Sequence, residues 1–120
     1  MTDATCASCG RRIEARRSHR GTPAKYCSKA CRTRRVRPID RALEEAILAL
    51  LDERAHGATL CPSEAARRVD EDGWQDRMED ARRAARRLVA AGRVEITQKG
   101  RVVDPSTAKG PIRIRKAHVG

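Results

Sequence analysis

Apolar residues recur at helical spacing in three consecutive segments of the chain. A first helix is expected from Asp40, a favourable N-cap residue, to about His56-Gly57. One face of this helix holds Leu43, Ala46, Ile47, Leu50 and Leu51. Pro62 suits the first turn of a short second helix that reaches Val69. A third helix is expected from about Asp76 to Ala91, before Gly92, and its inner face holds Met78, Ala81, Ala85, Leu88 and Val89.

Alternation of apolar and polar residues follows the third helix. Val94 and Ile96 alternate with polar neighbours, turn residues occupy 98–100, and Val102-Val103 resumes the apolar pattern, which predicts a β-hairpin. Three helices followed by a hairpin is the order of a winged helix-turn-helix domain. We therefore predict an α+β winged helix-turn-helix domain over residues 38–110. Residues 111–120 are expected to be a basic extended tail, whose alternating part adds an edge strand or lies along a partner.

Residues 1–37 follow neither pattern, because they hold too few aliphatic side chains to bury a core. They contain a C-x-x-C pair and a C-x-x-x-C pair separated by seventeen residues. Short spacers of this kind let both thiolates of a pair reach one tetrahedral ion at about 2.3 Å, and a shell of four cysteines leaves no position for a reacting water. We therefore predict a zinc-ribbon module over 1–37, including a basic linker, with one structural Zn²⁺ held by Cys6, Cys9, Cys27 and Cys31. The alternatives are that His19 replaces one cysteine, or that the cysteines are small buried hydrophobes.

The formal net charge of +11 and the pI of about 10.5 are typical of a protein that binds a polyanion. The charge is uneven: residues 1–37 carry eleven basic and two acidic side chains (+9), residues 38–110 thirteen and fourteen (−1), and residues 111–120 three basic ones (+3). The expected partner is nucleic acid, chiefly DNA, because Trp74 and Tyr26 are too few aromatics to stack unpaired bases. A coding bias towards arginine is the alternative. The candidate contacts lie in the linker, third helix, hairpin and tail: Arg32, Arg34, Arg35, Arg37, Arg82, Arg83, Arg86, Arg87, Lys99, Arg101, Arg113 and Arg115.

The third helix carries two opposed signals. Its four arginines lie opposite the apolar face, so they are expected to project outward together, either to phosphates or as a solvated face. Segment 70–80, however, holds six acidic residues against Arg77 alone, and these would repel phosphate: Asp70, Glu71, Asp72, Asp76, Glu79 and Asp80. The alternative function is therefore a protein–protein interaction adaptor that docks through this acidic segment of the winged helix.

Enzymatic activity is not expected. Cys61 precedes Pro62 at a helix start, where amide dipoles can lower a thiol pKa, and His56 is the only nearby base. The simpler interpretation is that Cys61 caps or packs the helix. No phosphate-binding loop or hydrolase motif occurs. The chain has neither a run of about 20 apolar residues nor a secretory signal, so we expect a cytoplasmic protein with no membrane contact and reduced cysteines.

Two resemblances accompany these patterns. The segments CASCGRR and KYCSKACRTRR resemble short bacterial zinc-ribbon modules over about residues 6–35, and such modules are generally structural. The segments CPSEAARRV and GRVEITQKGRVVDPSTAKGPIRIR, with Trp74, resemble an uncharacterised bacterial family of domains of unknown function over about residues 40–116. That second resemblance implies a winged-helix-like fold and companionship with a zinc module, and it implies no activity.

Overall fold

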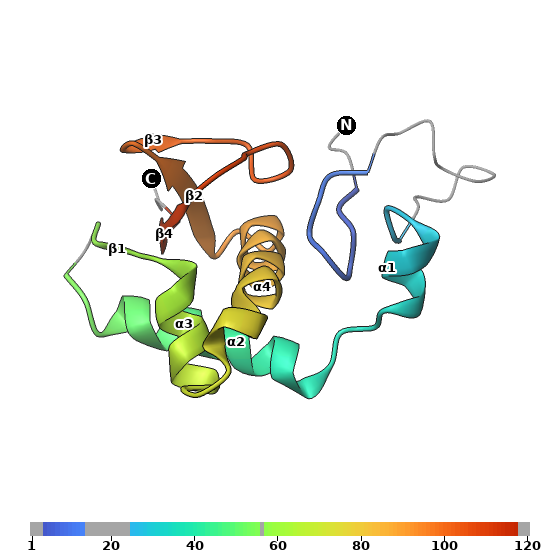
Figure 1. The fold of residues 1–120 in the computed structure, drawn as a ribbon. Helices are drawn as coiled ribbons and strands as arrows, with labels where there is room; N and C mark the ends of the chain where they lie inside the picture. Colours follow the sequence, from blue (N-terminus) through green and yellow to red (C-terminus); the bar gives the residue numbers. More distant parts are fainter. Residues whose placement is uncertain (1–3, 14–24, 56, 118–120) are drawn as a thin grey trace.

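The computed structural model describes residues 4–13, 25–55 and 57–117 (Figure 1). Within them the chain forms four α-helices, one short 3₁₀ helix and a four-stranded antiparallel sheet, a small α+β architecture. In chain order the elements are α1 (Lys29–Thr33), α2 (Pro38–Asp52), β1 (Thr59–Leu60), α3 (Pro62–Val69), η2 (Trp74–Arg77), α4 (Met78–Ala90), β2 (Val94–Gln98), β3 (Arg101–Val102) and β4 (Arg113–Lys116). In this part of the chain, no helix has the length and apolarity needed to cross a membrane.

Helix α2 begins three residues earlier than the sequence pattern indicated. Pro38 occupies the first turn and Arg37 is the N-cap residue. Asp40 is therefore not the N-cap, because its carboxylate reaches back from the first turn and accepts the Arg37 N–H at 2.8 Å. The helix also ends at Asp52, short of the expected boundary at Gly57.

The second and third predicted helices are confirmed. Helix α3 starts at Pro62, and the Glu64 carboxylate accepts the Cys61 N–H at 2.7 Å in a capping box. The third helix consists of η2 followed by α4. After α4, Gly92 has a φ of +75°, the left-handed conformation that ends many helices.

The predicted hairpin is confirmed, and the sheet contains two further strands. Strands β2 and β3 join through Lys99 and Gly100, whose φ values of +51° and +79° suit a tight hairpin turn. The strand order is β1-β4-β2-β3, so β4 pairs on both sides. The edge strand expected within 111–115 is therefore an inner strand, because Ile114 is paired with Leu60 on one side and Ile96 on the other.

The core lies between the sheet and helices α2, α3 and α4, and it is built without phenylalanine. Its largest side chains are aliphatic and at most 2% exposed: Leu43, Ile47, Leu51, Leu60, Ile96 and Ile114. Helix α4 packs on this core with its alanines, which lets it approach α2 and β2 closely. In Figure 1, α4 stands between the sheet and the N-terminal segment. This position gives α4 two covered faces.

Candidate metal centre

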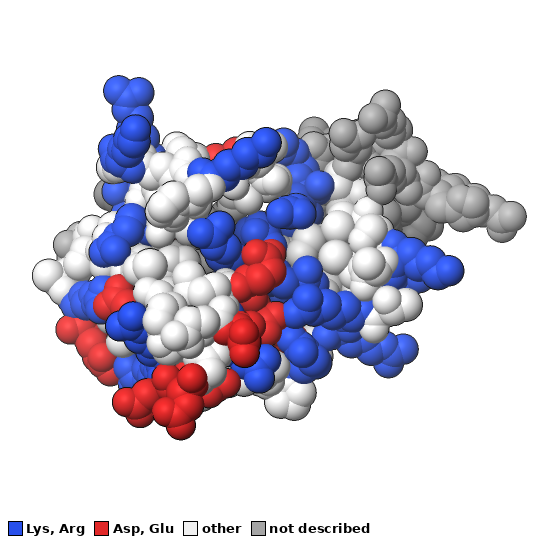
Figure 2. Space-filling model, in the orientation of Figure 1, with Lys and Arg blue, Asp and Glu red and all other residues white. Residues whose placement is uncertain are grey.

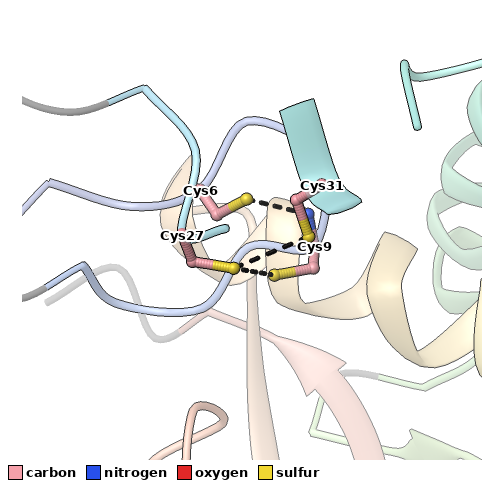
Figure 3. A group of neighbouring side chains, drawn as sticks. All are labelled: Cys6, Cys9, Cys27 and Cys31. Atoms are coloured by element: carbon pink, nitrogen blue, oxygen red, sulfur yellow. Dashed lines mark hydrogen bonds between the residues drawn. The ribbon is translucent and has the colours of Figure 1, made fainter. Parts of the chain in front are cut away.

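The four N-terminal cysteines lie together in one cluster (Figure 3). Cys6 and Cys9 belong to a tight loop, whereas Cys27 precedes α1 and Cys31 lies within it. All four Sγ atoms lie within 4.8 Å of one another, and Cys27 Sγ is 3.5 Å from the Sγ atoms of Cys9 and Cys31. Four sulfurs bound at about 2.3 Å to one tetrahedral ion would lie about 3.8 Å apart. The predicted grouping is therefore confirmed, and these residues could hold a metal ion.

Backbone hydrogen bonds shape both cysteine pairs. The Gly10 N–H donates to Cys6 O at 2.9 Å, and the Cys9 N–H donates to Cys6 Sγ at 3.5 Å. Gly10 has a φ of +77°, which a residue with a side chain would adopt only with strain. At the second pair, Ser28 Oγ accepts the Cys31 N–H at 3.2 Å and so caps α1.

The local environment gives the thiols of the cluster different pKa values. Burial raises the pKa of Cys6, but hydrogen bonds from backbone N–H groups, chiefly those of Cys9 and Cys27, outweigh it and lower that pKa to about 6. Burial, together with the neighbouring thiols of Cys31 and Cys9, raises the pKa of Cys27 to about 12. One position therefore favours a thiolate near neutral pH while another keeps its proton. A metal ion that binds all four sulfurs must displace the remaining protons.

Three arginines of α4 are buried against the cysteine loop. Arg83, Arg86 and Arg87 are 9%, 7% and 8% exposed, and Arg82 is half-buried. The prediction that all four project outward is wrong for these three, because the N-terminal segment covers the side of α4 that faces away from the core. In this structure their guanidinium groups are not available to phosphates.

Each buried arginine donates a hydrogen bond to the loop between the first two cysteines. Arg86 Nε donates to Cys9 O at 2.7 Å, and Arg87 Nη1 donates to Ser8 O at 2.6 Å. Arg83 Nη2 donates to the hydroxyl of Ser8, which is 2% exposed. Hydrogen bonds to charged groups contribute about 1.5–3 kcal/mol each. Sequence reasoning missed Ser8, because nothing in a C-x-x-C pattern marks the residue between the ligands as a contact.

Gly10 lies directly on the backbone of α4. A Cβ atom added to Gly10 would lie 2.4 Å from the carbonyl carbon of Arg86 and 2.5 Å from the nitrogen of Arg87. Next to this contact, Arg12 Nη1 pairs with Asp104 Oδ2 at 2.7 Å, and the Arg12 N–H donates to Ser106 Oγ at 2.8 Å. The cysteine loop therefore packs along α4 and reaches the loop that follows β3.

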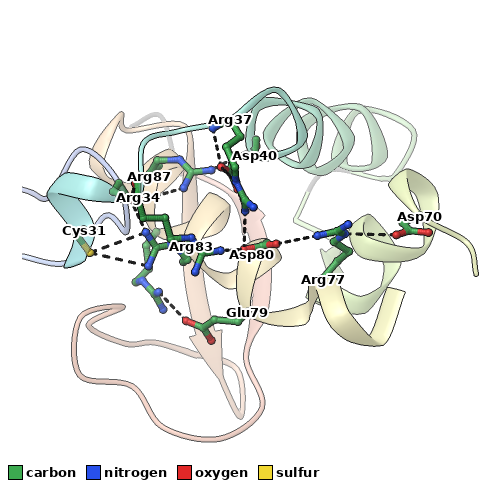
Figure 4. A network of polar contacts seen from close by, with 12 residues as sticks. Cys31, Arg34, Arg37, Asp40, Asp70, Arg77, Glu79, Asp80, Arg83 and Arg87 are labelled. Atoms are coloured by element: carbon green, nitrogen blue, oxygen red, sulfur yellow. Dashed lines mark hydrogen bonds and ion pairs between the residues drawn. The ribbon is translucent and has the colours of Figure 1, made fainter. Parts of the chain in front are cut away.

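A buried carboxylate joins the segment after α1 to α4 (Figure 4). Asp80 is 4% exposed and pairs with Arg34, with Arg37 at 3.2 Å and with Arg77 at 3.6 Å. Asp80 is therefore not part of an exposed acidic surface, contrary to the prediction for segment 70–80. The same pairs engage two predicted nucleic-acid contacts, although the side chains of Arg34 and Arg37 remain 42% and 44% exposed.

The remaining predicted nucleic-acid contacts differ in their partners. Arg113 is exposed and donates to Thr59 Oγ1 at 3.0 Å, and Arg115 is half-buried and pairs with Glu95 at 2.8 Å. Four others are exposed and form no ion pair with any residue that the structure describes: Arg32, Arg35, Lys99 and Arg101. Basic side chains gather over α1 and over the hairpin in Figure 2, while acidic ones gather below α3. These four exposed cations therefore lie outside α4.

The aromatic side chains of Trp74 and Tyr26 both pack against buried residues of the protein. Trp74 opens η2, lies half-buried against the core and carries the Arg67 guanidinium 4.2 Å from its ring centroid. It therefore anchors the turn before α4. Tyr26 packs against the cysteine cluster.

The fifth cysteine lies apart from the cluster. Cys61 is the N-cap residue of α3, and its Sγ accepts a hydrogen bond from Ser63 Oγ at 3.1 Å. This placement fits the capping interpretation. The proposed base His56 and the alternative metal ligand His19 both lie outside the described residues.

Comparison with known proteins identifies one relationship. A family described as "Protein of unknown function (DUF3253)" matches residues 40–117. The match runs from the first turn of α2 to just beyond β4, so it includes all four strands of the sheet. It leaves out the four clustered cysteines. The search of curated proteins found no match.

Proposed function

The chain belongs to the DUF3253 family of proteins of unknown function, and we propose that it is a zinc-containing nucleic-acid-binding protein, most simply a small DNA-binding or regulatory protein. The family description supplies no activity, so the support comes from this chain's own residues. The proposal has three parts: the metal, the fold of the matched region and the nucleic-acid surface.

The donor set supports zinc. Four thiolates with sulfurs 3.5–4.8 Å apart match a tetrahedral Zn²⁺ shell, and soft sulfur ligands favour zinc over magnesium or calcium. Cys6, Cys9 and Cys31 are at most 8% exposed. With all four positions filled by protein, the ion would stabilise the fold and would not activate a water molecule.

The element order supports a winged helix-turn-helix interpretation of the matched region. In that interpretation α3 and α4 form the helix-turn-helix, and β2 with β3 forms the wing. The outer face of α4, which such a domain would offer to DNA, is covered here by the cysteine loop. The contacts would therefore come from the wing and from the α1 side.

The observation that carries the nucleic-acid proposal is a set of exposed cations that form no ion pair with a carboxylate of the described residues. Arg32 and Arg35 line a shallow groove of about 570 Å³ beside Tyr26. Lys99 and Arg101 line a second groove, of about 930 Å³, which also includes Lys109 and Arg113. Among the described residues, no acidic side chain lines either groove. Phosphate oxygens would meet these cations without competition from a carboxylate that lines the groove in the described part of the chain.

Salt-dependent binding tests the proposal. The zinc-loaded chain is titrated with duplex DNA and with RNA of equal length between about 50 and 200 mM salt, where each phosphate contact contributes about −0.9 to the log–log slope on DNA. We expect Arg32→Gln/Arg35→Gln to reduce that slope by about 2. The control Arg68→Gln/Arg93→Gln removes the same charge from two exposed arginines elsewhere and should leave the slope unchanged. Absence of binding at low salt, or equal slopes for both double variants, would refute the proposal.

An interaction adaptor is the second candidate, and the exposed carboxylates at the α3–η2 end favour it. Glu71, Asp72 and Asp76 are exposed and form no ion pair with a described residue. They could receive a basic partner protein. The adaptor would be supported if the chain bound neither DNA nor RNA but still captured a protein partner after nuclease treatment. Charge reversal at Asp72 and Asp76 should then abolish the capture.

A further inference from the structure

We propose that Arg83 is a positioning residue of the metal centre. Its guanidinium donates hydrogen bonds to the metal-bound thiolate of Cys31, and this contact couples metal binding to the docking of the cysteine loop on α4. Arg83 Nη1 and Nη2 lie 4.0 and 3.9 Å from Cys31 Sγ (Figure 4). The guanidinium is buried, and α4 belongs to a part of the chain distant in sequence from the ligands. The metal centre is therefore completed by the matched domain.

Charge balance gives this contact its significance. Four thiolates around one divalent ion carry a net charge of −2, and a buried anion is costly unless donors surround it. Within the described residues, Arg83 is the cation whose hydrogen bonds reach a sulfur of the cluster, while the Cys9 N–H supplies a neutral donor to Cys6 Sγ. A charged donor lowers the electron density on the sulfur that accepts it. Arg83 therefore stabilises the thiolate form that the ion requires.

The same guanidinium also fixes the loop that presents the first two ligands. Arg83 donates to Ser8 Oγ, and that hydroxyl donates in turn to Arg34 O at 2.7 Å. Arg86 and Arg87 hold the carbonyl groups of the same loop. The cysteine loop, α4 and Arg34 are therefore joined through the Ser8 hydroxyl and the Arg83 guanidinium. Binding the metal orders the loop, and the ordered loop offers α4 the acceptors that it needs.

Metal titration of the full reduced chain tests the proposal with Co²⁺ as a spectroscopic probe and Zn²⁺ in competition with a chromophoric chelator. Arg83→Met keeps the length of the apolar stem and removes the donors. We expect its Zn²⁺ affinity to fall by about 10–100-fold, the usual effect of losing a partner that supports a metal ligand. We also expect its thiolate-to-Co²⁺ charge-transfer band to move to lower energy, because a thiolate without the donor is easier to oxidise.

Two further variants separate positioning from general stability. Arg83→Lys keeps a charged donor and should recover part of the affinity and of the band energy. Arg82→Met changes the neighbouring arginine, which is half-buried and forms no hydrogen bond with a described residue, and should stay within about twofold of the parent chain. Cooperative unfolding of each variant confirms that it is folded.

The inference rests on the metal-binding part of the proposed function and not on nucleic-acid binding. Unchanged affinity and band energy in Arg83→Met would overturn it. Weaker affinity with an unchanged band would also overturn it, because the effect would then be structural alone. A parent chain that gives no thiolate-to-Co²⁺ band would refute metal binding itself, whereas a flat salt slope would refute only the nucleic-acid proposal.

Discussion

Substitution of Gly10 by alanine tests whether the cysteine loop is docked on α4. The new Cβ would lie 2.4 Å from Arg86 C and 2.5 Å from Arg87 N, and a left-handed φ of +77° adds about 1–2 kcal/mol of strain for alanine. Helix backbone cannot yield, so the loop must retreat by about 1 Å, which weakens the hydrogen bonds from Arg86 to Cys9 O and from Arg87 to Ser8 O. At about 1.5 kcal/mol for each bond, docking loses about 3 kcal/mol beyond the strain.

Gly92→Ala is the matched control, because Gly92 has a φ of +75° and no atom lies within 4 Å of its added Cβ. Hydrogen exchange of the zinc-loaded chains measures the docking. Amide protection over residues 6–10 should fall by roughly 100-fold more in Gly10→Ala than in Gly92→Ala, which corresponds to about 3 kcal/mol. Equal protection in the two variants would show that the loop does not rest on α4, and the packing described above would then be incorrect.

Two further substitutions test carboxylates that the fold uses internally. Burial raises the pKa of Asp40, but hydrogen bonds from the side chain and backbone of Arg37 outweigh it and hold the pKa below its usual range. The stability that Asp40 adds is therefore fully present above about pH 4 and is lost as the pH falls through the lower folded-state pKa. Urea unfolding of Asp40→Asn should show a deficit of about 1–2 kcal/mol at pH 7 that shrinks progressively below about pH 4. A deficit that stays constant with pH would contradict this reasoning. Asp80→Asn should lower the free energy of unfolding by about 2 kcal/mol. This loss is smaller than for a fully buried ion pair, because the arginine partners of Asp80 keep solvent contact. Asp76→Asn is the control at an exposed position and should change the free energy of unfolding by less than about 0.5 kcal/mol.

The elements that depend on local chemistry were predictable from the sequence. Pro62 after a capping residue marked the start of α3, and alternation before and after the Lys99-Gly100 turn marked the hairpin. The cysteine pairs were equally clear, because their spacing and the absence of an alternative core left few other interpretations. In each case the determining interaction lies within a few residues along the chain.

The contacts between distant segments were not predictable in the same way. A helical wheel correctly separates Arg83, Arg86 and Arg87 from the apolar face of α4, but it does not show that a second layer covers the polar face. The acidic run at 70–80 likewise gives no sign that Asp80 turns inward to meet Arg34. The position of β4 depends on β1, which is only two residues long and has little pattern of its own.

The inner position of β4 determines the order in which the molecule can assemble during synthesis. Strand β1 cannot pair until residues 114 and 115 have been synthesised, whereas all four clustered cysteines have been made by residue 31. The growing chain therefore passes through a stage in which the four clustered cysteines are present while α4 and its arginines have yet to be made. Early metal capture would depend on the cysteines alone, and full retention would follow only when the last strand closes the sheet behind α4.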